Sequence, residues 1–135
     1  YDGTNWTAVT AIPATSSSAT AFGVQTSAVL AGGYDGSTWQ QTALEYDGTN
    51  YSSGGSMPST TGAQYAGSAG TQTAALSYGG SPSITNTEGY DGTAWSTKPA
   101  LASGQEDTSG TNTGTAIAAW VAGGHPALNN VDSPL

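Results

Sequence analysis

Three short runs of small apolar residues, each closed by a pair of glycines, are the clearest hydrophobic pattern in the chain. They are Gln25–Gly33 (QTSAVLAGG), Gln72–Gly80 (QTAALSYGG) and Ala116–Gly124 (AIAAWVAGG). Apolar runs of this length that end in glycine are typical of buried β-strands. We therefore expect strands at about residues 25–31, 72–78 and 116–122, with structural turns at Gly33, Gly80 and Gly124.

The residues around the second run complete a pattern of four strands. Ile84–Tyr90 alternates as a half-buried strand does. Asp91–Gly92 then predicts a hairpin turn, because glycine accepts a positive φ and aspartate caps the turn, and the chain returns through Trp95–Leu101. With a first strand at Ala63–Ala69, about 44 residues contain four strands and no helical periodicity.

Two independent markers repeat with one period. Tyr-Asp-Gly begins at Tyr1, Tyr46 and Tyr90, 45 and 44 residues apart, and the Gly-Gly pairs end 47 and 44 residues apart. The corresponding turns are Asp2–Gly3, Asp47–Gly48 and Asp91–Gly92. A period in the mid-forties fits one blade of a β-propeller. We expect an all-β chain of about three such blades, each of four antiparallel strands.

A fourth Tyr-Asp-Gly, in Tyr34–Trp39, directly follows Gly33 and breaks the period. We interpret it as a longer loop or an extra turn within its blade.

These features together resemble the kelch motif: an apolar strand ending in Gly-Gly, a Tyr-Asp turn, a Trp five residues after the Tyr, and Met57–Pro58. Gly70–Gly80 and Leu44–Tyr51 are most similar to the Gly/Thr/Ala-rich kelch-like repeats of bacteriophage structural proteins. The resemblance covers nearly the whole chain and implies a kelch-like β-propeller. The chain departs from the motif in lacking the Arg that commonly follows Met-Pro, and Met-Pro occurs once. One fold hosts many functions, so the resemblance specifies function poorly.

The ends of the chain fall in phase with the repeat. Residues 1–13 supply a return strand (Trp6–Pro13), and residues 108–135 supply the other strands of a blade, so residues 1–135 read as one repeat array with a split blade. Three blades are fewer than the usual 4–8 of a propeller. The chain starts with neither a Met nor a signal peptide. We expect a portion of a longer chain or an oligomeric ring, in which Trp6–Pro13 pairs with an adjoining segment, another copy or the chain's own strands near Val131.

Composition narrows the classes of partner. The net charge is −8, with one lysine or arginine (Lys98) and no cysteine. Nucleic acid and anionic membrane surfaces are not expected partners, because both need basic clusters. No apolar stretch reaches the roughly 20 residues of a membrane span, so no membrane insertion is expected. The chain is 36% hydrophobic and 9% aromatic, which indicates a folded protein.

The turn aspartates, including Asp35, are the first candidates for chemistry. We expect each to satisfy its own turn. Calcium needs six to eight oxygens gathered at one point, which one Asp per repeat does not supply. Asp-Gly-x-x-Trp is similar to the Asp-box of sialidases, but the spacing differs and the arginines that bind the substrate carboxylate are missing.

His125 is the other candidate for catalysis. It has no recognisable nucleophile or partner. The copper site of galactose oxidase, which has a kelch-like propeller, needs several His and a Cys-linked Tyr that this chain lacks. We expect no enzyme activity, no metal and no cofactor.

Aromatic and asparagine residues give two further possibilities. Trp6, Tyr51 and Trp95 recur at one repeat position and are expected to pack against a neighbouring sheet, whereas Trp39 and Trp120 are candidates for surface recognition. Asn5 and Asn50 lie in N-glycosylation sequons, although both also fit as turn residues.

The sequence thus predicts a non-enzymatic structural and recognition module of an extracellular or virion fibre, such as a phage tail-fibre or capsid-associated protein. Its expected partners are other copies of itself or adjoining fibre protein. With one lysine and no arginine, it offers trypsin very few sites. The alternatives are a lectin or adhesin propeller that binds cell-surface glycans and a polymeric extracellular fibril subunit.

Overall fold

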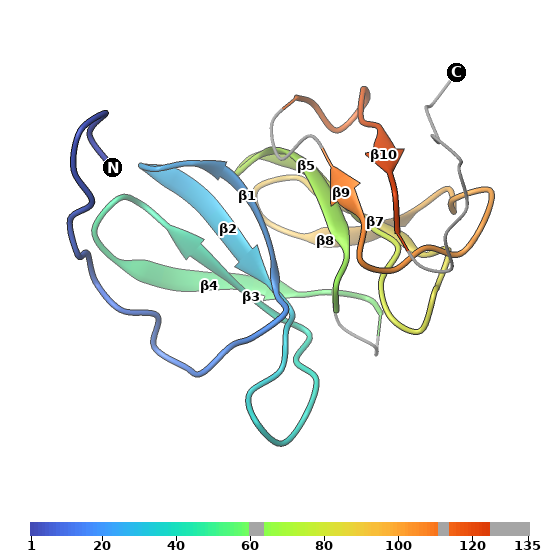
Figure 1. Cartoon of the computed structure of the whole chain (residues 1–135), viewed down its shortest axis with the longest axis horizontal. Helices are drawn as coiled ribbons and strands as arrows, with labels where there is room; N and C mark the ends of the chain where they lie inside the picture. The colour runs from blue at the N-terminus through green and yellow to red at the C-terminus, as the bar shows by residue number, and fades with distance from the viewer. Residues whose placement is uncertain (60–63, 111–113, 125–135) are drawn as a thin grey trace.

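The computed structural model describes residues 1–59, 64–110 and 114–124. Over these ranges the chain forms ten β-strands and no helix (Figure 1), so the all-β prediction is confirmed. The strands form two four-stranded sheets and one two-stranded sheet, and each sheet is made of consecutive strands.

The first sheet is an antiparallel meander of four strands in the order β1-β2-β3-β4. Its strands are β1 (Thr20–Val24), β2 (Ser27–Ala31), β3 (Thr42–Tyr46) and β4 (Tyr51–Ser56). Val24 pairs with Ser27, so the β1–β2 hairpin turns through two residues. The long loop between β2 and β3 contains the fourth Tyr-Asp-Gly, in which Tyr34 bridges to Trp39.

The second sheet repeats this plan in the order β5-β6-β7-β8. Its strands are β5 (Gly67–Thr71), β6 (Ala74–Tyr78), β7 (Thr87–Tyr90) and β8 (Trp95–Lys98). Thr71 pairs with Ala74, which gives the same two-residue turn as in the first sheet. The third unit consists of β9 (Ser109–Gly110) and β10 (Val121–Ala122), which pair antiparallel.

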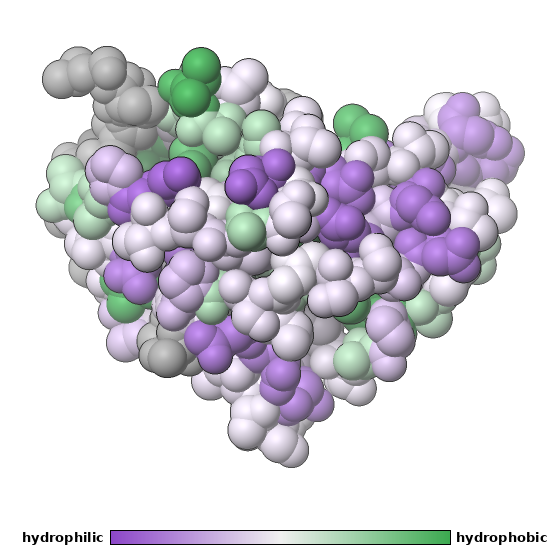
Figure 2. Space-filling view, turned by 180° about the vertical axis from the view of Figure 1, so that it is seen from behind, coloured by the Kyte–Doolittle hydropathy of each residue, from purple (hydrophilic) through white to green (hydrophobic). Residues whose placement is uncertain are grey.

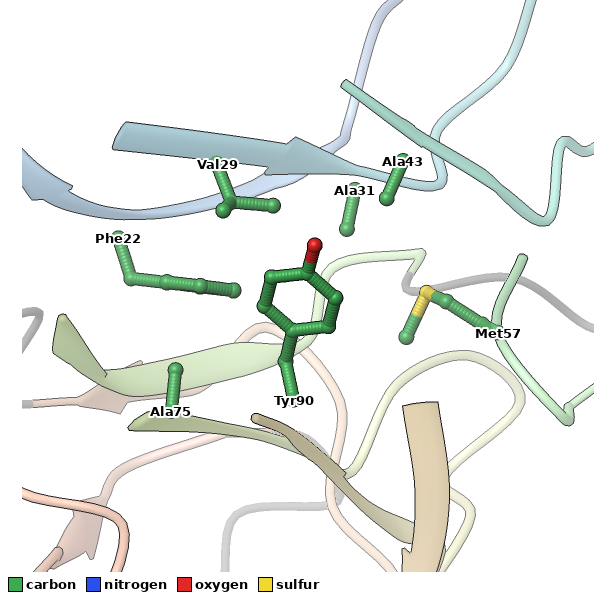
Figure 3. Packing of buried hydrophobic residues seen from close by; sticks show 7 residues of the cluster. All are labelled: Phe22, Val29, Ala31, Ala43, Met57, Ala75 and Tyr90. Atoms are coloured by element: carbon green, nitrogen blue, oxygen red, sulfur yellow. The ribbon is translucent and has the colours of Figure 1, made fainter. Parts of the chain in front are cut away.

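The sheets pack face to face through two apolar clusters. Between the first and second sheets lie Phe22, Val29, Ala31, Ala43, Met57, Ala75 and Tyr90. In Figure 3 the ring of Tyr90 stands between the sheets with its hydroxyl group toward the first sheet. Between the second sheet and the third unit lie Ala69, Tyr78, Ala119 and Val121. The leading strands also follow one another in space, since β1 contacts β5 and β5 contacts β9. The described residues form no closed ring.

Several predicted strand bounds are wrong by a few residues. The strands expected from Gln25 and Gln72 begin at Ser27 and Ala74, because Gln25–Thr26 and Gln72–Thr73 form the hairpin turns. The preceding strand accordingly lies at Gly67–Thr71 and not at 63–69. The strand expected at 116–122 is reduced to Val121–Ala122, because Thr115 and Ala118 bridge in a local turn.

The segment before β1 carries no strand, so the return strand expected at Trp6–Pro13 is not formed. It lies at the left of Figure 1, beside the first sheet and away from β9 and β10. Residues 1–15 are all exposed, so this segment packs against no strand that could pair with it. The expected pairing of Trp6–Pro13 with strands near Val131 lies outside the described residues.

Figure 2 shows a mostly polar surface on which apolar side chains form separate patches. The part of the chain that the structure describes has no helix that could cross a membrane.

Candidate functional site

The four Tyr-Asp-Gly turns have one geometry. Asp2 Oδ1 accepts hydrogen bonds from the backbone N–H groups two and three residues later, at 2.8 Å each. Asp47 and Asp91 repeat this arrangement at 2.7–2.9 Å, and so does Asp35. The following glycines all have positive φ, between 92° and 102° at Gly3, Gly36, Gly48 and Gly92. The turn therefore uses both the carboxylate and the glycine of the motif.

The hydrogen bonds to these carboxylates determine their electrostatics. Backbone N–H donors lower the pKa of Asp2, Asp35, Asp47 and Asp91 below its usual range, because they stabilise the charged form. Each carboxylate thus stays ionised and serves its own turn. Within the described ranges, no three His, Cys, Asp or Glu side chains gather as metal ligands.

The second glycine of each Gly-Gly pair lies against a neighbouring backbone. Gly33, Gly80 and Gly124 have φ of 92°, 121° and 103°. A Cβ at Gly80 would lie 2.9 Å from the carbonyl oxygen of Gln64, and one at Gly33 would lie 2.7 Å from that of Ser17. Both the φ angle and the close approach require glycine here. The pairs therefore join each second strand to the segment that precedes the first.

The contact between the first and second sheets, which we call the junction, is the most elaborate site in the molecule. The Tyr90 hydroxyl donates to Glu45 Oε1 at 2.6 Å, and Trp95 Nε1 donates to the Gly54 carbonyl at 3.1 Å. The Trp95 ring also packs edge-on against Phe22, with a centroid distance of 6.1 Å. Burial and the neighbouring Glu45 raise the pKa of Tyr90, so its hydroxyl keeps the proton that it donates.

Gln72 joins the hairpin turn of the second sheet to the first sheet. Its Nε2 donates to the carbonyls of Ala28 (3.1 Å) and Tyr46 (3.2 Å), while its Oε1 accepts from the Ser27 hydroxyl at 2.7 Å. Ser68 Oγ adds a bond to the Ala21 carbonyl at 2.8 Å. The junction thus combines apolar packing with hydrogen bonds that specify the position of one sheet on the other.

Glu88 is the buried carboxylate of the junction, with 4% of its surface exposed. Its Oε1 accepts from the Ser59 backbone N–H at 2.5 Å, whereas its Oε2 is buried without a hydrogen-bond partner. Burial raises the pKa of Glu88, and the Ser59 bond offsets this only in part. A small hollow beside it is lined by Met57, Ser77 and Asn86, among others.

The two tryptophans expected at the surface are both partly exposed. Trp39 (38% exposed) packs against Tyr34 and Tyr65, with centroid distances of 4.8 and 6.3 Å. Trp120 (45% exposed) lies at the edge of an apolar hollow of about 310 Å³ that Leu76, Tyr78 and residues 99–102 also line. The structure does not bring the two together into one site.

The remaining predicted residues lie apart from these sites. Trp95 packs in the junction and Tyr51 stacks on Tyr46, but Trp6 is 86% exposed, so the expectation that it packs against a sheet is wrong. No neighbouring sheet reaches Trp6 in the described structure. Asn5 and Asn50 are exposed in their turns. His125 lies outside the described residues.

Sequence reasoning missed the polar part of the junction, which consists of Gln72, Ser68, Glu45 and the Tyr90 hydroxyl. One signal was available: Gln and Tyr recur at the same repeat positions, as Gln25 with Gln72 and Tyr46 with Tyr90.

The chain matches no model of a known protein family, and no curated protein is similar to it in sequence.

Proposed function

We propose that the chain is a non-enzymatic, kelch-like repeat module of an extracellular or virion fibre, such as a phage tail-fibre or capsid-associated protein. In this role its work is architecture and recognition at a surface. Its partners are further copies or adjoining fibre protein.

The observation that carries this proposal is the repetition of one docking plan along the chain. The two complete sheets have the same strand order and the same two-residue hairpins. Residues at equivalent positions, such as Phe22 with Ala69 and Val29 with Leu76, form the successive apolar clusters. Units that bury one face on the next give an extended scaffold, as in other repeat proteins.

The chemistry of the surface supports the same role. The turn carboxylates are committed to backbone N–H groups of their own turns. With one lysine and no arginine, the chain would resist trypsin outside a cell.

Immunogold electron microscopy tests this proposal. An antibody against the 135-residue chain would be applied to particles and filaments from the culture medium of the producing organism. Label along fibres or on particle surfaces is expected. Label confined to the cell interior would overturn the proposal.

A carbohydrate-binding module is a second candidate, and the cluster of Tyr34, Trp39 and Tyr65 favours it. Two of these rings are partly exposed, and Tyr65 holds a positive φ of 52° in the loop before β5. Exposed aromatic faces beside polar groups, here Asp35 with Gln40 at 2.6 Å, suit the stacking of a sugar ring.

A glycan array with the purified chain tests this second candidate. Binding that Trp39→Ala abolishes and Trp6→Ala leaves intact is expected if the cluster holds a glycan. Trp6 is the matched control, because it is exposed and lies outside the cluster. Absence of binding, or equal loss in both variants, would reject a lectin site here.

A further inference from the structure

One face of the first sheet packs in the junction, and no other sheet covers the opposite face, where Leu30 and Leu44 line a shallow hollow with Ala14–Ser16. Val29 and Ala31 on β2 and Ala43 on β3 lie in the junction cluster. Because side chains alternate along a strand, the residues between and beside them point to the other side of the sheet. We call that side the open face, and its central residues are Ala28, Leu30, Leu44 and Tyr46.

The equivalent side of the second sheet is the one that docks on the first sheet. The repeat aligns the four residues of the open face with Ala75, Ser77, Glu88 and Tyr90, in that order. These four are 0%, 2%, 4% and 3% exposed, whereas all four open-face residues are only half-buried. The open face even carries leucines where the docked face carries Ser77 and Glu88. In the second sheet this face is docked on the preceding unit. The open face of the first sheet is therefore a candidate for the same kind of contact.

The two equivalent tyrosine hydroxyls differ in their hydrogen bonding. The Tyr90 hydroxyl donates to Glu45 on the neighbouring sheet. The hydroxyl of Tyr46, at the equivalent position, is buried and has no hydrogen-bond partner. The first sheet thus carries the cost of a buried hydroxyl without a partner, about 1–3 kcal/mol, where the second sheet has a hydrogen bond.

The third unit supplies the complementary surface. Ala119 and Val121 are buried against the second sheet, and Trp120 lies between them. The repeat aligns Trp120 with Val29 and Leu76, both of which contact the next unit along the chain. Trp120 is 45% exposed, whereas Val29 is 1% exposed. A large apolar residue at a contact position is thus left uncovered.

We propose that the open face of the first sheet docks the Trp120 side of the third unit of a second copy, head to tail. This inference rests on the proposed structural role and adds the surface and the partner to it. The contact repeats the junction: apolar packing around Ala28 and Leu44, with Gln25 of the docking copy in the role of Gln72. A head-to-tail contact closes into a ring when its rotation permits and otherwise extends as a filament.

Sedimentation velocity of the full chain over a range of concentrations tests the proposal. The wild type is expected to self-associate. Ala28→Glu adds a charge to the open face and Trp120→Ser removes the apolar group of the third unit, so each is expected to weaken association at least tenfold. Ser96→Glu is the matched control, because it adds the same charge at an exposed position on the second sheet, which takes no part in the proposed contact, and should leave association unchanged.

Mixing the two variants tests the head-to-tail geometry. Ala28→Glu retains its Trp120 side and Trp120→Ser retains its open face, so their mixture is expected to form a dimer that neither variant forms alone. A circular dichroism spectrum checks that each variant folds, and Leu44→Ser replaces Ala28→Glu if that variant does not.

Three results would overturn the inference: a wild type that is monomeric at every concentration, association that both variants leave unchanged, or a mixture that does not associate. Each is distinct from failure of the proposed function. A monomeric chain that still labels fibres in the immunogold experiment would refute the self-contact alone.

Discussion

The two complete sheets have nearly the same backbone but different surroundings. The second sheet is packed on both sides, by the first sheet and by the third unit, and Tyr90 on it is 3% exposed. The first sheet packs against another sheet on one side only, and Tyr46 at the equivalent position is half-buried with an unsatisfied hydroxyl. The contribution of the tyrosine to stability therefore differs between the two sheets, because its neighbours differ. Stability in such an array is a sum over contacts between adjacent units.

Truncating the two equivalent tyrosines should give the largest contrast. Tyr90→Ala removes a ring from the packed junction and is expected to cost about 3–5 kcal/mol of unfolding free energy, as large-to-small core substitutions do. Tyr46→Ala at low protein concentration should cost less, because its ring is only half-buried. Denaturant unfolding of both variants measures the difference. Equal losses would show that the junction adds nothing to the local sheet.

Removing only the hydroxyl groups sharpens the same comparison. Tyr90→Phe breaks the hydrogen bond to Glu45 and is expected to cost about 1.5–3 kcal/mol, the range for bonds to charged groups. Tyr46→Phe removes a buried hydroxyl without a partner and should be neutral or slightly stabilising. The midpoints of urea unfolding compare the pair, and a destabilised Tyr46→Phe would contradict this assignment.

A substitution at the Gly-Gly pair tests the turn that both sheets share. Gly80→Val is expected to cost about 1–3 kcal/mol, because φ is 121° and the Gln64 carbonyl oxygen lies close. Gly36→Val is the control, since Gly36 also has a positive φ but has no atom within 4 Å of an added Cβ. Thermal unfolding should show the larger loss at Gly80. An unchanged melting temperature would mean that the pair is not a structural turn.

The smallest expected effect concerns Glu88, which aligns with Leu44 of the first sheet. Its folded-state pKa lies above the ordinary value of 4.5, so the folded protein binds the proton more tightly than the unfolded chain. The stability from Glu88 is therefore fully present below pH 4.5 and is lost as the pH rises through the raised pKa. Glu88→Gln should remove this dependence and raise the melting temperature at neutral pH. A pH series of melting curves, with the wild type beside it, checks the sign.

The local signals in the sequence were enough for much of the fold. Asp-Gly dipeptides placed the turns, because their geometry depends only on adjacent residues. The Gly-Gly pairs and the period placed the sheets in order. The start of β6 was wrong because Gln72–Thr73 forms a two-residue turn without glycine or proline, which local propensity does not signal.

Contacts between residues far apart in the chain could not be predicted from the sequence. The Gln72 side chain bonds residues 26 and 44 positions away, and nothing in its neighbourhood distinguishes it from a surface glutamine. The prediction that Trp6 is buried was wrong for a related reason. Burial at this repeat position requires a neighbouring sheet, which Trp6 does not have. The pattern identified the position and not the partner.

The chemical make-up of the junction has a consequence for its environment. Its cross-sheet hydrogen bonds come from amide, indole, hydroxyl and backbone groups, and the carboxylates Glu45 and Glu88 are held by uncharged donors. Mobile ions screen attraction between opposite charges, with a Debye length of about 3 Å at 1 M salt, but they weaken neutral contacts of this kind little. The sheets should therefore stay docked in brine as firmly as in dilute buffer.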